Sequence, residues 1–481
     1  MFTISEIAAA TGGRIIGPAT GQVDGVSTDS RTITPGKLFV PLRGEQFDGH
    51  TFISDVAAKG IAVLLVNECW LKGHTAPDKA TCIAVKNTLR ALGDLAQSWR
   101  NRFDIPIFGV TGSNGKTTVK EMLATILELK GHGLKTAGNL NNLIGLPQML
   151  FQLRQEHGWA VMEMGMSEPG EIDRLSEIAR PHYGIVLNAL PAHLLSMGTV
   201  EAVAAAKGEL LLRISDGGLA VVNADDPRVA SLPQNPSAGR ISFGINRGEV
   251  RAKEIELLGM KGQRLLIVTP TGEMSVLLRA CGRHSVYNAL AATAALLDKV
   301  ELSVIAEGLE NFVPYKGRFQ LEQSEGITII DDSYNANPAS IKAALETLNQ
   351  IAENGHRIAV LGDTLELGEH EVEAHLGVGA VAGRNADRIY LLGRLMTVYA
   401  ADGAIIADMP AESIARCTGH KEIAELLFHS LRQKDVLLIK GSRGMAMENV
   451  ITELKKLMLE RKKTEYRSQN SEGATVTSDS F

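Results

Sequence analysis

Cysteine is scarce in this chain, and its cysteines form no close pair. Cys69, Cys82, Cys281 and Cys417 are widely separated, so neither a disulfide framework nor a Cys-x-x-Cys zinc site is predicted. The sequence also lacks an apolar run near the roughly 18 residues that span a bilayer. Glu6 stands where a signal peptide has basic residues. We therefore expect a protein of the reducing cytoplasm with no membrane insertion.

An excess of positive charge is missing as well. The chain has 49 Lys and Arg against 55 Asp and Glu, a formal net charge of −6, which argues against nucleic acid as the main partner. Apolar residues at 44% and charged residues at 22% are typical of a globular protein. At 481 residues the chain is too long for one ordinary core, and a prior of roughly 150 residues per domain predicts about three domains.

The most informative motif is a Gly-rich turn at residues 111–118, which lies between an apolar run and a helix-like run. In that setting glycines let backbone N–H groups point at phosphate oxygens, and the helix N-terminus favours negative charge. Lys116 would reach the terminal phosphates, and the Thr117 hydroxyl would ligate Mg²⁺. The alternative is a turn that only caps a helix. We predict a nucleoside triphosphate site formed by Thr111, Gly112, Ser113, Asn114, Gly115, Lys116, Thr117 and Thr118.

Alternating strands and helices divide the chain into three predicted domains. Residues 1–103 are predicted to contain short strands and helices in no regular order. Residues 104–313 alternate between strands and helices, with antiparallel strands expected at 250–279, and residues 314–461 alternate between strands and helices again. Such alternation predicts parallel sheets covered on both faces, with ligands at the carboxyl ends of the strands. The predicted fold class is α/β, with a small mixed N-terminal domain, a central P-loop domain and a C-terminal Rossmann-like domain. Residues 462–481 are nearly free of apolar side chains and are predicted to be a disordered tail.

Apolar runs and their periodicity also predict individual elements. Strands are expected at residues 37–42, 62–66, 106–110, 159–164, 184–189, 219–223, 328–332, 357–362, 388–393 and 436–440. Helices are expected at residues 87–101, 117–129, 146–154, 168–179, 200–214 and 286–297.

Charged side chains follow two of these strands. Glu163 lies at the carboxyl end of one, where an acidic residue can hold Mg²⁺. His193 follows the next strand, and Lys207 lies fourteen residues later within an Ala-rich helix. Poor hydration there disfavours the charged form of Lys207, so we expect its pKa to lie below the usual value of about 10.4 and the neutral amine to be favoured. Taken singly, each would be a solvated loop or helix residue, so the inference rests on their joint spacing.

The P-loop lacks the first Gly of the commonest pattern, and Lys207 lies in Ala-x-x-Lys-Gly-Glu. Together these features resemble the Mur ligase and folylpolyglutamate synthetase superfamily, which joins an amino group to a carboxylate by way of an acyl phosphate. The resemblance implies that Thr117, Glu163, His193 and Lys207 hold about two Mg²⁺ ions and that Lys207 is carbamylated. It makes Lys116, His193 and Lys207 the catalytic candidates.

Later motifs resemble the nucleotide contacts of the same family. Residues 282–289 would supply Asn288 to the adenine of ATP, although Ser285 stands where the family often has Asn. Arg318 would reach the phosphates and Asp332 the ribose. The first domain resembles the UDP-binding domain of muramoyl peptide ligases. The implied substrate-binding residues are Ser30, Arg31, Asn139, Asn141, Asn142, Tyr334 and Asn335.

Motifs at residues 331–338, 361–368 and 440–444 resemble the family members that act on UDP-N-acetylmuramoyl-tripeptide and D-Ala-D-Ala. The resemblance therefore implies a monomeric, ATP-dependent ligase of cell-wall precursor synthesis. Two alternatives stay open. One is a related ligase that adds diaminopimelate, lysine or glutamate, and the other is an inactive nucleotide-binding scaffold, which would need a broken set of metal ligands.

Overall fold

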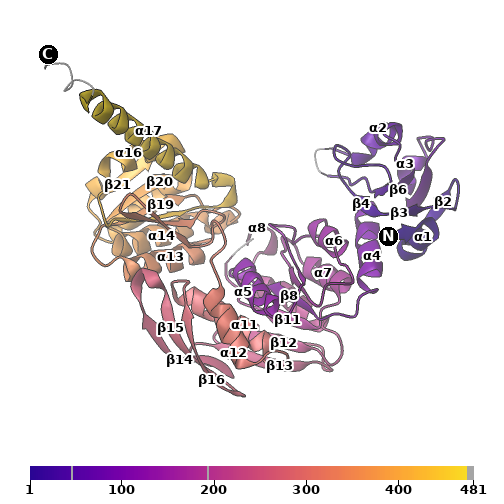
Figure 1. Ribbon diagram of the computed structural model, residues 1–481, viewed down its shortest axis with the longest axis horizontal. Coiled ribbons are helices and arrows are strands. Elements are labelled where there is room, and N and C mark those ends of the chain that lie inside the picture. Colours follow the sequence, from indigo (N-terminus) through magenta and orange to yellow (C-terminus); the bar gives the residue numbers. More distant parts are fainter. Residues whose placement is uncertain (45–46, 192–193, 474–481) are drawn as a thin grey trace, which may run out of the picture.

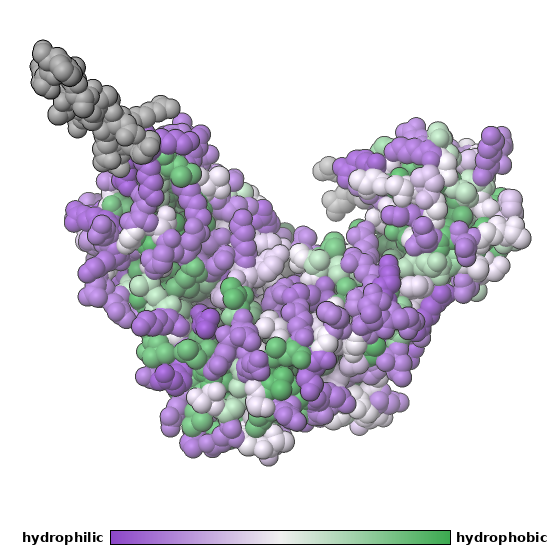
Figure 2. Space-filling model, viewed as in Figure 1, coloured by the Kyte–Doolittle hydropathy of each residue, from purple (hydrophilic) through white to green (hydrophobic). Residues whose placement is uncertain are grey.

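The structure is a computed structural model that describes residues 1–44, 47–191 and 194–473. Its N-terminal and C-terminal parts form the two arms of an open V, with the central part at the base (Figure 1). The surface is deeply hollowed between the arms (Figure 2). Within the described residues no helix is long and apolar enough to cross a membrane.

The N-terminal arm is a small sheet with helices around it. The buried strands Val63–Asn67 (β6) and Thr81–Val85 (β7) lie at its centre because all or nearly all of their side chains are apolar. The sheet order β2-β7-β6-β5-β4 is completed by Arg14–Ile16 (β2), Lys37–Phe39 (β5) and Gly25–Ser27 (β4), while Phe2–Thr3 (β1) pairs with Gln22–Val23 (β3). The helices are Ile4–Thr11 (α1), Ile53–Ala58 (α2), Glu68–Leu71 (α3) and Thr88–Arg100 (α4).

Helix α4 joins this arm to the central part. Its buried apolar side chains, Ala91, Leu92, Leu95 and Ala96, lie on one helix face. They belong to one apolar cluster that also holds Phe2 and Ile7 of the arm and Ile107 of the central sheet. Polar contacts cross the same junction: Arg100 Nε donates to the Ala179 carbonyl at 2.8 Å, and Gln97 Nε2 donates to the Glu177 carbonyl at 2.6 Å. The N-terminal arm and the central part therefore share a continuous core.

The central part is a nine-stranded sheet, counting described strands, in the order β16-β15-β14-β13-β12-β11-β8-β10-β9. All neighbours from β9 to β14 are parallel, and β14, β15 and β16 are antiparallel. The strands are Ile107–Thr111 (β8), Leu134–Lys135 (β9), Ala160–Glu163 (β10), Tyr183–Val186 (β11), Leu219–Asn223 (β12), Gly239–Gly244 (β13), Val250–Leu257 (β14), Gln263–Thr269 (β15) and Gly272–Leu278 (β16). The helices are Lys116–Glu128 (α5), Gly145–Leu150 (α6), Glu171–Ala179 (α7), Leu194–Met197 (α8), Val200–Leu212 (α9), Pro227–Ala230 (α10), Arg283–Leu296 (α11) and Leu302–Asn311 (α12). Alternate residues of β8 and β10 enter two different apolar clusters, so both faces of the sheet are covered.

The C-terminal arm has its own sheet, in the order β17-β18-β22-β19-β20-β21, with only β17 antiparallel. Its strands are Gln320–Ser324 (β17), Ile327–Asp332 (β18), Arg357–Gly362 (β19), Arg388–Leu392 (β20), Ile414–Cys417 (β21) and Val436–Lys440 (β22). Its helices are Pro338–Ile351 (α13), Glu371–Asn385 (α14), Ala401–Ile406 (α15), His420–Ser430 (α16) and Glu448–Gly473 (α17). Among the described residues, every buried side chain of its two apolar clusters except Cys281 belongs to this arm. This arm therefore folds around a core of its own.

The predicted three-domain α/β class is confirmed, while the boundaries at residues 103, 313 and 461 stay predictions. The helix predicted at 146–154 ends at Leu150. Beyond Phe151, the N–H groups of Gln152 and Leu153 bond three residues back, which tightens the chain into turns. One prediction needs correction: the disordered tail expected from residue 462 begins instead as the continuation of α17 to Gly473. This segment contains Lys, Glu, Arg and Gln, which favour helix, and no Pro or Gly before Gly473. Residues 474–481 lie outside the described part.

Candidate active site

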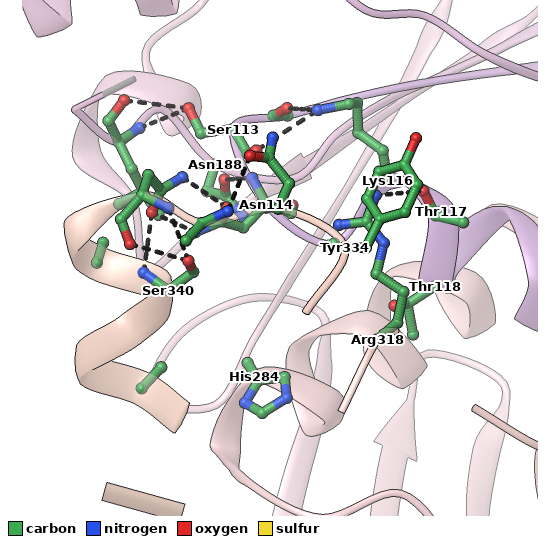
Figure 3. A pocket seen from close by; sticks show the side chains of 18 of the residues that line it. Ser113, Asn114, Lys116, Thr117, Thr118, Asn188, His284, Arg318, Tyr334 and Ser340 are labelled. Carbon is green, nitrogen blue, oxygen red and sulfur yellow. Dashed lines mark hydrogen bonds between the residues drawn. The ribbon is translucent and has the colours of Figure 1, made fainter. Parts of the chain in front are cut away.

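A cleft of about 900 Å³ lies where the carboxyl ends of the central strands face the C-terminal arm. The turn after β8, the loop at residues 138–142 and the N-terminus of α11 line it from the central side. The loops after β18, β19 and β22 line it from the other side. Figure 3 shows side chains from the central part and from the C-terminal arm converging there. This agrees with the rule that ligands of parallel α/β sheets bind beyond the carboxyl ends of the strands.

The predicted P-loop connects β8 directly to α5. Gly115 lies before the first residue of α5 with φ of 89°, and no side chain caps the helix. A Cβ at this position would overlap Asn288 Oδ1. The uncapped first turn leaves helix N–H groups available to an anion. The loop is thus shaped for close approach of a phosphate.

Replacing Gly115 with Ala is expected to weaken MgATP binding by about tenfold or more, since it adds both backbone strain and an overlap with Asn288. The matched control is Gly170→Ala, because Gly170 precedes α7 with φ of 84° and has open space where a Cβ would be. The control carries the same backbone strain at a residue that does not itself line the cleft. Calorimetric titration with MgATP distinguishes the two, and equal affinities for both variants would contradict a nucleotide role for this turn.

Lys116 rests on its own loop. Its Nζ donates to the Gly112 carbonyl at 2.7 Å and to the Ser113 carbonyl at 3.4 Å. Burial lowers the pKa of this ammonium, the Glu163 carboxylate opposes that change, and the Arg318 charge adds to it. Phosphate oxygens would replace the two carbonyl acceptors, since they are the stronger partners for an ammonium group.

Glu163 lies at the end of β10 and is 2% exposed. Its Oε2 accepts a hydrogen bond from the Thr117 hydroxyl at 2.9 Å, and its Oε1 accepts one from Asn141 Nδ2 at 2.8 Å. Hydroxyl and carboxylate oxygens suit Mg²⁺. In the described part of the chain no group of three or more His, Cys, Asp or Glu could hold a metal. A cation here would therefore take its remaining ligands from phosphate, water or other side chains.

Lys207 lines the same cleft from α9 and is 3% exposed. Burial lowers its pKa well below the usual value, and the positive charge of Lys116 adds to the effect. Among the described residues it has no hydrogen-bond or ion-pair partner. The geometry therefore favours a neutral amine facing the cleft. His193, the other predicted metal ligand of this group, lies outside the described residues.

The central part and the C-terminal arm both contribute to the predicted nucleotide contacts. Arg318 Nη2 lies 3.4 Å from the Thr117 hydroxyl, and its guanidinium carbon lies 4.1 Å from the centre of the Tyr334 ring (Figure 3). Arg318 Nε and His284 Nδ1 are buried without a partner in the described structure. Buried polar atoms are normally satisfied, so these two atoms fit a cleft that takes a polar ligand. Asn288 also lines it.

Asp332 is held by a residue that sequence reasoning missed. Its Oδ2 pairs with Lys440 Nζ at 2.6 Å, and its Oδ1 accepts from the Phe319 N–H at 3.1 Å. Burial lowers the pKa of Lys440, and Asp332 opposes the shift. The Lys-Gly-Ser-Arg-Gly motif gave the position of Lys440, but not its partner. Asn188 was missed in the same way: its Oδ1 accepts from the Asn114 N–H at 2.9 Å.

The structure separates the remaining predicted residues. Most of them line the cleft, namely Gly112, Ser113, Asn114, Thr118, Asn139, Asn141, Asn142, Tyr334 and Asn335. Thr111 does not, because its hydroxyl is buried and donates to the Met164 carbonyl at 2.9 Å. Ser30 and Arg31 lie in the N-terminal arm, where Arg31 Nε pairs with Asp29 at 2.9 Å. The cleft thus contains most of the residues predicted to bind the nucleoside triphosphate. It does not contain Ser30 and Arg31, which were predicted to bind the uridine diphosphate substrate.

Comparison with known proteins covers all three parts of the chain. Family models match at residues 22–100 (Mur ligase family, catalytic domain), 110–296 (Mur ligase middle domain) and 317–443 (Mur ligase, glutamate ligase domain). Curated relatives named UDP-N-acetylmuramoyl-tripeptide–D-alanyl-D-alanine ligase include one from Escherichia coli (strain K12), 36% identical over 94% of this chain and 98% of that protein. Another, from Bacillus subtilis (strain 168), is 32% identical over 94% of this chain and 98% of that protein.

Solved structures agree over nearly the whole chain. A crystal structure of MurF from Acinetobacter baumannii is 35% identical with a TM-score of 0.86, covering 95% of this chain and 99% of that one. MurF ligase from Thermotoga maritima in complex with ADP is 27% identical with a TM-score of 0.80, covering 91% of this chain and 98% of that one.

Proposed function

The chain belongs to the Mur ligase family, and on this premise we propose that it joins D-alanyl-D-alanine to UDP-N-acetylmuramoyl-tripeptide with hydrolysis of ATP to ADP. The product is the pentapeptide precursor of peptidoglycan. One observation carries the proposal: the P-loop, Glu163 and Lys207 of the central part face Arg318 and Lys440 of the C-terminal arm across a single cleft.

The chemistry follows from the charges in the cleft. A carboxylate oxygen of the tripeptide bonds to the γ-phosphorus of ATP as the bond to ADP breaks. The amine of D-Ala-D-Ala then attacks the acyl phosphate, loses its extra proton, and phosphate leaves as the amide forms. The first step brings two anions together, so charge neutralisation and positioning are the main requirements. Lys116 and Arg318 supply positive charge at the phosphates, and the Thr117 hydroxyl and Glu163 would hold Mg²⁺, which when bound shields the phosphate oxygens.

Lys207 is proposed to carry a carbamate. Its neutral amine would attack CO₂, an N–C bond would form, and one proton would leave, so that a buried cation becomes an oxygen anion that supports a second Mg²⁺. Burial and the lowered pKa support this reaction, because only the unprotonated amine adds to CO₂.

The C-terminal arm is proposed to move against the rest of the molecule. Its apolar clusters are nearly separate from those of the central part, whereas the N-terminal arm shares its core. Docking of this arm would exclude water, which would otherwise hydrolyse the acyl phosphate. Because the cleft is complete within one chain, we further propose that the ligase acts as a monomer.

The purified protein is expected to release phosphate from ATP only when UDP-N-acetylmuramoyl-tripeptide and D-Ala-D-Ala are both present. A coupled phosphate assay checks this, with single amino acids as alternative acceptors. The Lys116→Met variant serves as the control for contaminating ATPase and should release none. Turnover with diaminopimelate, lysine or glutamate in place of D-Ala-D-Ala would contradict the assignment.

A further inference from the structure

A reciprocal amide pair connects the P-loop directly to the C-terminal arm. Asn337 Nδ2 donates to Asn114 Oδ1 at 2.8 Å, and Asn114 Nδ2 donates back to Asn337 Oδ1 at 3.3 Å. The two residues are 223 positions apart in the sequence. Between the described P-loop and this arm, the other recorded hydrogen bond joins Arg318 to Thr117 at 3.4 Å. The amide pair is therefore the shorter polar connection.

The orientation of Asn337 is fixed by the helix it begins. Its Oδ1 accepts from the Ser340 N–H at 2.9 Å, and its own N–H donates to Ser340 Oγ at 3.0 Å, which forms a capping box at the start of α13. With the oxygen held by the helix N-terminus, the Nδ2 group is left for the P-loop. A rigid element of the C-terminal arm thus presents a hydrogen-bond donor to the phosphate-binding turn.

Asn114 is held on its other side by the central sheet. Its N–H donates to Asn188 Oδ1 at 2.9 Å, and Asn188 Nδ2 donates to its carbonyl at 3.1 Å. Figure 3 shows Asn114 close to Asn188 and on the side of the cleft where Ser340, in the first turn of α13, also lies. Asn188 fixes the backbone of the turn, while the side chain is held, among the described residues, by Asn337 at the N-cap of α13. Glycines flank this stretch at positions 112 and 115, so without side contacts the turn has wide conformational freedom.

We propose that Asn337 is a positioning residue of the ATP site, and that its pair with Asn114 couples docking of the C-terminal arm to binding of the ATP phosphates. The inference rests on the proposed ATP-dependent function. It adds a contact through which the position of the C-terminal arm depends on whether ATP is bound. Coupling is reciprocal: an arm that orders the turn strengthens ATP binding, and bound ATP holds the arm in place by the same factor. Two hydrogen bonds of this kind correspond to roughly 5- to 30-fold in affinity.

The test is a double-mutant cycle on the full chain, titrated with a non-hydrolysable ATP analogue and Mg²⁺. Asn337→Ser keeps a good N-cap but is too short to reach Asn114, so α13 stays stable. Asn114→Ala removes the other half of the pair. Asn87→Ser is the matched control, because Asn87 caps α4 in the same way, accepting from the Arg90 N–H at 3.0 Å, far from the cleft.

In the otherwise wild-type protein, Asn337→Ser is expected to weaken binding of the ATP analogue roughly 5- to 30-fold. In a protein that already carries Asn114→Ala, it is expected to have no further effect. Asn87→Ser should leave the affinity for the ATP analogue unchanged, while it changes the melting temperature by about as much as Asn337→Ser does. Equal losses in both backgrounds, or no loss in either, would overturn the inference. The outcome is independent of the acceptor: failure of D-Ala-D-Ala to support phosphate release would remove the proposed function, while an additive cycle in an active ligase would remove only the coupling.

Discussion

Replacing Lys207 with Ala is expected to lower ligase turnover by about 10²- to 10³-fold, the range associated with removing one preorganised group that stabilises charge in an active site. Adding formate or acetate should restore part of the activity. The reason is that the proposed carbamate provides an oxygen anion, and a small carboxylate can occupy the space that the shortened side chain leaves. The measurement is phosphate release with both substrates across a carboxylate titration.

Lys120 offers a matched control for this experiment. It is also a buried lysine, 1% exposed, but its Nζ donates to the Thr136 carbonyl at 2.7 Å and pairs with Glu121 at 2.9 Å. Lys120→Ala should therefore lower stability, and added carboxylates should not restore activity. Full activity of Lys207→Ala, or equal rescue of both variants, would contradict the carbamate.

Replacing Glu163 with Gln is expected to lower kcat by about 10²-fold or more and to raise the Mg²⁺ concentration needed for half-maximal rate. The amide keeps the shape of the side chain, but it loses the charge and replaces one acceptor oxygen with a donor. An amide nitrogen facing Asn141 Nδ2 cannot accept its hydrogen bond, and one facing Thr117 can only donate to the hydroxyl, which reverses that hydrogen bond. Rates measured across a Mg²⁺ titration report both changes.

The matched control is Glu171→Gln. Glu171 also borders the cleft, but its Oε2 accepts from the Ser167 and Glu168 N–H groups at 2.6 Å and 3.1 Å, so it organises a turn. Removal of its charge should leave the Mg²⁺ dependence unchanged. A Glu163→Gln enzyme with an unaltered Mg²⁺ requirement would rule out Glu163 as a ligand.

The P-loop was predictable because its determinants are local. An apolar strand, a glycine at positive φ and a helix start are all encoded within about ten consecutive residues, and the structure places Lys116 and Thr117 in the cleft as expected. Strand β12 matches its predicted range for the same reason. Edge strand β17 was not predicted, because its Gln-Leu-Glu-Gln-Ser sequence is half exposed and carries no apolar signal.

Contacts between segments that lie far apart in the sequence could not be predicted from spacing. The ion pair of Asp332 with Lys440 and the amide pair of Asn114 with Asn337 depend on how β18 lies beside β22 and how α13 meets β8, which no local pattern encodes. Ser30 and Arg31 illustrate the reverse case. A family resemblance identified them, and the structure places them in the N-terminal arm, apart from the residues that line the cleft.

The core that α4 shares between the N-terminal arm and the central sheet has a consequence for substrate selection. If the uridine diphosphate end binds on that arm, as the sequence predicts, the distance from the uridine site to the P-loop is set when the protein folds. The distance between these two sites then limits which peptide lengths can reach the P-loop. A precursor whose peptide is one residue too short leaves its carboxylate short of the γ-phosphate, however tightly its uridine is held. Under that prediction, the length of the peptide would be checked by the rigid junction that α4 forms.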